Sequence, residues 1–306
     1  MTVTERTPPP PSAPQTPPVL TGRGHDRAPR EYGFRTVLLI CLGIGIVFLA
    51  VLLVYVLLEG WPRLDLDLFR NQGSQISPAT AGAQAAIYGT LWLMAGTALL
   101  ILPLGVMSAI YLEEYADPEK WYNRLIEVNI QNLAAVPSVV YGILGLGLVV
   151  RGPLSLGPVL LAGMIILALL VLPVVIISSR EAIRAVPDSI RDGSLALGAT
   201  RWQTIWRTTL PNSVPGIATG SILALSRAIG EAAPLVIIGV ALTVTFNPAS
   251  VYDRFTTLPM QIYSYAQRPQ EDFIILSSAL IIVLLVIMLA MNSVAILIRN
   301  KYQRRW

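Results

Sequence analysis

Two charged residues, Arg227 and Glu231, stand four positions apart inside a long apolar stretch, residues 213–245. A helix through this stretch would place both side chains on one face, near the middle of the stretch. The guanidinium of an arginine presents a planar set of donors that matches the oxygens of an oxyanion, and a carboxylate can accept an acidic hydrogen from one. The pair therefore predicts a path for an oxyanion. The alternative is structural: the two charges neutralise one another or pair with charges on a neighbouring subunit.

The surroundings of the pair indicate a position inside a packed assembly. An arginine at the centre of a lipid-exposed helix costs about 2.5–3.5 kcal/mol or more, so a helix surrounded by lipid would rarely carry one. The same stretch contains a Gly-x-x-x-Gly sequence at Gly216 and Gly220, followed by many Ser and Ala residues. Small residues let helices approach closely. We therefore expect this helix to be interior, with its charged face toward a cavity or a subunit interface.

The composition places these residues in an integral membrane protein. Of the 306 residues, 54% are hydrophobic and 13% are charged, about half the roughly 25% typical of soluble domains. The single Cys and single His exclude an intrachain disulfide and a four-ligand zinc site. Cys41 lies in an apolar run, and we expect it to be a buried apolar side chain. The two lysines stand outside any phosphate-binding loop, so this chain is not expected to hydrolyse ATP by that route.

Six apolar stretches are long enough to cross a bilayer, which needs about 20 residues of helix. Four of them are almost uninterrupted: 36–58, 85–112, 157–177 and 273–298. The other two, 128–150 and 213–245, contain polar or charged residues. Pro103 and Pro137 fall within two of the stretches, where kinks are expected and hinges are the alternative. The fold class predicted is an all-α membrane protein with six transmembrane helices.

The distribution of Lys and Arg predicts the orientation. The segments on the side that both termini share hold 16 of these residues, and the opposite loops hold 5. Both termini are therefore expected in the cytoplasm, and the net charge of +4 reflects the inner face of the membrane, not binding of nucleic acid. Residues 1–35 contain eight prolines and are expected to form a disordered tail. A second, short cytoplasmic tail is expected at 299–306.

One cytoplasmic loop, within 180–211, has the sequence features of a helical hairpin. Pro187 and Asp188 are typical of a helix start, and Gly198 stands where a left-handed C-terminal cap belongs. Thr200 and Gln203 form the capping-box pattern for a second helix, which we expect Pro211 to end. This helix would be amphipathic, with an apolar stripe formed by Trp202, Ile205, Trp206 and Leu210. Two interpretations stay open: a hairpin lying on lipid headgroups, or an element that docks into another protein.

The residues of this loop resemble a cytoplasmic loop that permease subunits of ABC importers carry. That pattern reads Glu-Ala-Ala, three residues, Gly, nine residues, Ile, one residue, Leu-Pro. Here the sequence Asp192-Gly193-Ser194 takes the first positions, Gly198 follows at the same interval, Thr208 takes the Ile position and Leu210-Pro211 closes the pattern. The resemblance implies that the loop couples the permease to an ATPase subunit. The residues implied in coupling are Asp192, Gly193, Ser194, Leu197, Gly198, Ala199, Leu210 and Pro211.

Four longer stretches are similar to the phosphate-specific, PstA-type branch of these permeases. They begin at Asn132, Leu195, Ser226 and Thr257, and the resemblance covers about residues 85–298. Ser226-Arg227-Ala228-Ile229-Gly230-Glu231 is the most specific of them, because few membrane helices carry two charges four residues apart. The resemblance implies a permease core of five helices at 85–298, preceded by the first transmembrane helix at 36–58. It implies the type I importer fold in a bacterial inner membrane.

The resemblance also implies an assembly: a second, similar permease, two ATPase subunits that bind ATP and Mg²⁺, and an external phosphate-binding protein. This chain itself is expected to bind no cofactor or metal and to have no catalytic residue. Arg227 and Glu231 are the predicted substrate path. Because phosphate at pH 7 still carries an acidic hydrogen and sulfate does not, Glu231 would favour phosphate. The alternatives are a permease for another oxyanion, such as sulfate or molybdate, and a stand-alone secondary carrier driven by an ion gradient.

Overall fold

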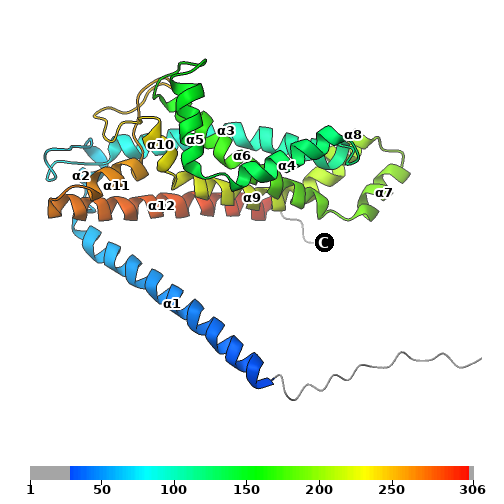
Figure 1. The fold of residues 1–306 in the computed structure, drawn as a ribbon, viewed down its shortest axis with the longest axis horizontal. Coiled ribbons are helices and arrows are strands. Elements are labelled where there is room, and N and C mark those ends of the chain that lie inside the picture. Colours follow the sequence, from blue (N-terminus) through cyan, green and yellow to red (C-terminus); the bar gives the residue numbers. More distant parts are fainter. Residues whose placement is uncertain (1–27, 303–306) are drawn as a thin grey trace, which may run out of the picture. The chain divides into compact units, whose positions relative to one another are not determined.

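The computed structural model describes residues 28–302, and within this range the chain is helical, with no β-strand (Figure 1). The all-α fold class is therefore confirmed. The contacts divide the chain into two units, Met1–Leu53 and Val54–Trp306, and helix α1(Ala28–Gly60) runs through the boundary between them. The segment Tyr32–Arg63, which includes most of α1 and crosses this boundary, is an apolar helix of the length that a bilayer requires.

The second unit contains the remaining helices. They are η1(Trp61–Arg63), α2(Leu66–Arg70), α3(Gln84–Ile110), η2(Tyr111–Tyr115), α4(Trp121–Ala135), α5(Ser138–Gly145), η3(Leu146–Val150), α6(Leu160–Arg184), α7(Asp188–Ala196), α8(Arg201–Thr204), η4(Ile205–Thr209), α9(Leu210–Ile229), α10(Ala233–Ile237), α11(Leu258–Ala266) and α12(Glu271–Tyr302). Of the four η segments, η1 is a 3₁₀-helix and the others are single π-helical turns.

Several expectations at the chain ends need correction. Helix α1 begins at Ala28, so residues 28–35 are helical and the predicted tail is shorter than 1–35. Of the eight prolines of that tail, Pro29 lies at the start of α1, and the other seven lie outside the described residues. The second tail is shortened too, because α12 continues to Tyr302. Cys41 is exposed, so its predicted burial is wrong; its helix is apolar all round and has no polar face to direct Cys41 inward.

Four helical segments are long and apolar enough to cross a membrane: Tyr32–Arg63, Gln84–Tyr115, Leu160–Arg184 and Glu271–Leu297. They correspond to the four strong predicted stretches: 36–58 and 85–112 fall wholly within them, whereas 157–177 begins before Leu160 and 273–298 ends just after Leu297. The predicted stretch 128–150 is not one straight helix, since it is formed by part of α4 and by α5 with η3, which meet at an angle of 104°. The predicted stretch 213–245 is α9, a break, the short helix α10 and a loop. Both departures are breaks in the helix, and both concern the candidate site.

The bend between α4 and α5 has a local cause. Pro137 has no N–H to donate and its ring disfavours helical geometry in the preceding residue, so α4 ends at Ala135. The end of α4 leaves carbonyls without a partner in the helix. Among them, the Leu133 carbonyl accepts from the N–H of the capping residue Val136 over 3.2 Å and from the hydroxyl of buried Tyr141 over 2.9 Å. Tyr141 thus fastens α5 to the end of α4 across the bend.

Close packing of α6 on its neighbours forms the centre of the second unit, and in Figure 1 α12 runs alongside α9. At the contact of α6 and α9, a Cβ added to Gly220 would lie 2.1 Å from Ser178 Oγ, and one on Gly216 would lie 2.6 Å from Ala182 Cβ. The predicted close approach through Gly216 and Gly220 is therefore confirmed, and α6 is the partner helix. These contacts fix the position of α9, which leads to Arg227.

Candidate functional site

The predicted charged pair lies at the break that follows α9. Arg227 is in the last turn of α9, about 26 Å along the axis from Leu210 at 1.5 Å per residue. Gly230 ends the helix, so Glu231 lies beyond it. The prediction that both residues occupy the middle of one continuous helix is therefore wrong. The structure still brings them together, because Arg227 Nε lies 3.4 Å from Glu231 Oε1.

The second broken helix meets the first one at this place. Helix α10, which follows Glu231 after one residue, packs on α5, which follows the bend at Pro137. At this contact there is no room for a side chain at position 142 of α5: a Cβ on Gly142 would lie 2.9 Å from Pro234 Cα and 3.0 Å from Ile237 Cδ1. Discontinuous helices that meet inside a membrane protein are a common way to build a substrate site, because they leave backbone groups and charges at membrane depth.

The guanidinium of Arg227 is available to a ligand. Among the described residues its one hydrogen bond is the contact of Nε with Glu231, and no protein group bonds to its two terminal nitrogens. The side chain is 46% exposed. Its place at the C-terminal end of α9 favours a cation, because the helix dipole is negative there. The two terminal nitrogens of Arg227 are therefore free to donate, in a forked geometry, to two oxygens of one anion.

The contact between α5 and α10 gives a direct test of the site's architecture. We expect Gly142→Ala to reduce transport about tenfold or more, because an added methyl displaces α10 by some tenths of an ångström, and such misplacements near a reactive site can cost up to about 10²-fold. Uptake into vesicles measures the effect. Gly147→Ala is the matched control, since no atom lies within 4 Å of the added Cβ. Equal uptake by the two variants would contradict a functional role of this contact.

The helical hairpin predicted within 180–211 forms as its sequence predicts. Helix α7 begins at Asp188 after Pro187, and Gly198 adopts φ +85°, the left-handed conformation that favours glycine. Thr200 Oγ1 accepts from Gln203 N over 3.3 Å, and Gln203 Oε1 accepts from Thr200 N over 2.9 Å. The predicted capping box is therefore confirmed. The two helices are also tied by a 3.0 Å hydrogen bond between the hydroxyls of Ser194 and Thr204.

The second limb of the hairpin does not end at Pro211, which corrects the sequence prediction. The chain continues as helix from α8 through the π-helical turn η4 into α9. In a π-turn the hydrogen bonds skip one more residue, so the helix can pass a proline that has no N–H to offer. The amphipathic pattern is only partly right: Ile205 is fully buried, whereas Trp202 and Trp206 are exposed and contact each other, with ring centroids 5.2 Å apart. Helix η4–α9 thus connects the hairpin to Arg227 without a loop.

The eight residues predicted to act in coupling fall into two groups. Six lie on α7 and in the turn, where Asp192, Gly193, Leu197 and Gly198 are exposed and Ser194 and Ala199 are partly exposed. Leu197 is 91% exposed at the tip. The other two, Leu210 and Pro211, begin α9 at the base of the hairpin, where Leu210 packs against a small buried cluster of Ala109, Ile183 and Ile217.

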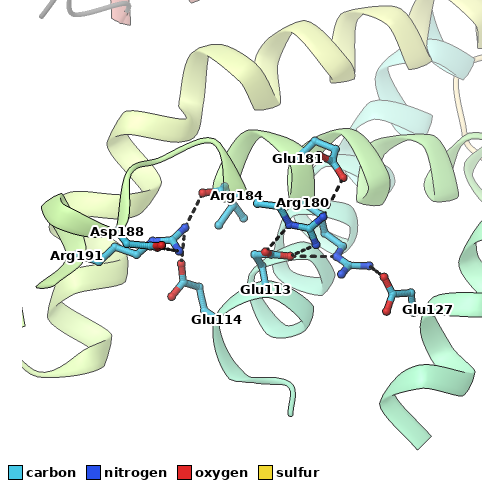
Figure 2. A network of polar contacts seen from close by, with 9 residues as sticks. Glu113, Glu114, Glu127, Arg180, Glu181, Arg184, Asp188 and Arg191 are labelled. Atoms are coloured by element: carbon cyan, nitrogen blue, oxygen red, sulfur yellow. Dashed lines mark hydrogen bonds and ion pairs between the residues drawn. The ribbon is translucent and has the colours of Figure 1, made fainter. Parts of the chain in front are cut away.

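Sequence reasoning missed a network of charges at the base of the hairpin (Figure 2). Glu113, in η2, accepts from Arg180 over 3.4 Å and from Arg184 over 2.9 and 3.1 Å, both on α6. Arg180 also donates to Glu127 of α4 over 3.0 Å. Glu114, which follows Glu113 in the chain, faces Arg191 of α7 at 3.4 Å. A signal was present in the sequence: acidic residues follow the stretch 85–112 and basic residues follow 157–177, at the same side of the membrane.

Comparison with known proteins agrees with this architecture. Residues 101–306 match the family model described as "Binding-protein-dependent transport system inner membrane component". The chain is 31% identical over 224 residues to the phosphate transport system permease protein PstA 1 of Mycobacterium tuberculosis (strain CDC 1551 / Oshkosh), which covers 73% of this chain and 72% of the relative. It is 29% identical over 242 residues to the probable ABC transporter permease protein YqgI of Bacillus subtilis (strain 168), covering 76% of each.

A solved structure shares the fold. A crystal structure of a bacterial ABC transporter involved in the import of the acidic polysaccharide alginate has a chain that matches with a TM-score of 0.66 and 18% sequence identity. The match covers 90% of this chain and 97% of that chain. At this level of identity the likeness concerns the fold, which is that of a type I ABC importer permease.

Proposed function

The chain belongs to the family of binding-protein-dependent transport system inner-membrane components, and on this premise we propose that it is the permease subunit of an ATP-driven importer of inorganic phosphate. It is a multi-pass inner-membrane protein and a transport subunit, not an enzyme, because in this family partner ATPases hydrolyse ATP. The observation that carries the assignment to phosphate is the similarity, over most of both chains, to relatives named phosphate transport permeases.

The geometry of Arg227 supports an anion path. Its two terminal nitrogens have no bond to another described residue, and its side chain ends at the junction of two broken helices. Phosphate would take these two donors through two of its oxygens. Glu231, held beside the guanidinium, would accept the acidic hydrogen that phosphate carries. A bound phosphate would thus meet a donor pair and an acceptor at once.

The exposure of this site supports a second permease subunit as a partner. Arg227 is 46% exposed in the single chain, in a segment that we expect to lie within the membrane. Contact with lipid would cost about 2.5–3.5 kcal/mol for an arginine at the centre of a bilayer, so another protein surface or water must cover the side chain. We infer that a similar permease covers it, and that the substrate path lies between the two subunits.

The hairpin is the proposed docking element for an ATPase. Permeases of this family work with ATPase subunits and with an external binding protein. An exposed tip with Leu197, Gly198 and neighbouring small residues suits insertion into a groove of a partner. The orientation that this role requires, with the hairpin and both termini in the cytoplasm, agrees with the distribution of Lys and Arg. ATP and Mg²⁺ would bind to two ATPase subunits, and an external phosphate-binding protein would deliver the substrate.

Reconstitution of the complete importer tests this proposal. The permease pair, the ATPase and the binding protein would be placed in vesicles, and uptake of phosphate, sulfate and molybdate would be compared with and without ATP. We expect uptake of phosphate that requires ATP. Uptake of a different oxyanion would overturn the substrate, and phosphate uptake by this chain alone without ATP would identify a secondary carrier.

The role of Glu231 has its own test. We expect Glu231→Gln to lower the ratio of phosphate to sulfate uptake about tenfold, because an amide cannot accept the acidic hydrogen of phosphate as a carboxylate does and no longer repels sulfate. The measurement is competitive uptake of the two labelled anions by the reconstituted importer. An unchanged ratio would show that selectivity resides elsewhere, in the external binding protein.

A further inference from the structure

Arg191 is an anchored residue on the mostly exposed helix α7. Its side chain is 19% exposed, whereas Asp192 and Gly193, which follow it, lie on the surface. The guanidinium contacts three groups: the Ile183 carbonyl of α6, to which Nη2 donates over 2.6 Å, Asp188 at 3.3 Å and Glu114 at 3.4 Å. Figure 2 shows these contacts at the start of the hairpin. One side chain of α7 therefore reaches both α6 and the end of α3.

The two acidic residues of η2 divide between two helices. Glu113 is bound by Arg180 and Arg184 of α6, and Glu114 faces Arg191 of α7. The same π-helical turn therefore connects the cytoplasmic end of α3 to α6 and to the hairpin. Glu113 and Glu114 are mostly buried, and ion pairs in such positions are geometrically specific, because an unpaired buried charge is costly.

The contact between Arg191 and Glu114 differs from the other ion pairs of the network in having no hydrogen bond. The pair lies at 3.4 Å without a hydrogen bond, and among the described residues neither Arg191 Nε nor Glu114 Oε1 has a hydrogen-bond partner, although both atoms are buried. A small shift of α7 toward η2 would let Arg191 Nη2 donate a hydrogen bond to Glu114 Oε1. The contact can therefore be tightened or loosened by a movement of less than an ångström.

We propose that Arg191 is a positioning residue that transmits movement of the hairpin to α3 and α6 during transport. The first limb, α7, acts through Arg191 on Glu114 and on the Ile183 carbonyl, and the second limb acts through the continuous helix η4–α9. Since α6 packs on α9, both routes converge on the helix that carries Arg227. This inference rests on the proposed function, because it requires the ATPase to move α7.

The test uses the complete importer in vesicles and measures phosphate transported per ATP hydrolysed. We expect Arg191→Ala to lower this ratio about tenfold, within the range that residues of a coupling network show, while ATP hydrolysis and co-purification of the ATPase are retained. Arg191→Lys and Glu114→Gln should each lower it less, because each keeps part of the contact set. Adding Glu114→Gln to Arg191→Ala should have no further effect, since the contact is already lost.

The controls separate the possible outcomes. Glu181→Gln removes an exposed ion pair with Arg184 in the same network and should leave the ratio unchanged. If Arg191→Ala fails to assemble, Arg191→Lys and Glu114→Gln decide. A ratio equal to wild type in these variants, or a parallel loss of hydrolysis and transport, would overturn the role of Arg191. A wild-type complex that imports phosphate without ATP would overturn the proposed function and this inference with it.

Discussion

Replacing Arg227 by alanine is expected to reduce phosphate uptake by at least about a hundredfold, the loss typical when one preorganised donor to an anion is removed. The physical reason is that the terminal nitrogens of Arg227, at the junction of α9, α10 and α5, donate no hydrogen bond to any described residue and can bind the anion. Without them a desolvated phosphate would have to pass the junction beside Glu231, whose charge repels it. Uptake by the reconstituted importer, with purified binding protein in excess, measures the effect.

Three observations complete this experiment. Arg227→Lys keeps the charge but loses the planar fork, so it should transport at an intermediate rate. Arg151→Ala, in an exposed position of the loop 151–156, should leave uptake unchanged. Should Arg227→Ala prevent the subunits from assembling, the pair with Glu231 is structural, and the assignment of an anion path to it fails.

The second large effect is expected at the tip of the hairpin. Leu197→Asp should abolish co-purification of the ATPase with the permease, because a charge would replace an exposed apolar side chain at the centre of the proposed contact. A hot-spot residue at such a place contributes roughly 2 kcal/mol or more to binding. The fold should be unaffected, since Leu197 is 91% exposed. The measurement is the amount of ATPase retained on the tagged permease in detergent, together with the melting temperature of the permease.

The matched control for this variant is Leu154→Asp. Leu154 is 56% exposed and lies in the loop 151–156, on the side of the membrane that is predicted to face outward. The two variants make the same chemical change on opposite sides. Equal retention of the ATPase by Leu197→Asp and by wild type would show that the hairpin tip is not the docking element, and the lipid-surface interpretation of the hairpin would then be favoured.

The sequence by itself determined those features that depend on residues close together in the chain. The hairpin turn was predictable because Gly198, Thr200 and Gln203 satisfy backbone groups within one turn of helix. The apolar stretches were predictable because crossing a bilayer imposes a length and a composition on each helix. The close packing of α9 was predictable from Gly216 and Gly220, although their partners on α6 were not.

The tertiary structure alone decided where the helices break and which charges meet. Spacing placed Arg227 and Glu231 on one helix, but the helix ends at Gly230, and the short helix α10 is held instead by packing on Gly142. The contact of Glu113 with Arg180 joins residues 67 positions apart, and Arg191 of α7 faces Glu114 of η2. Such contacts have no local signal, because their free energy depends on the desolvation and distance that the packed helices impose on each pair.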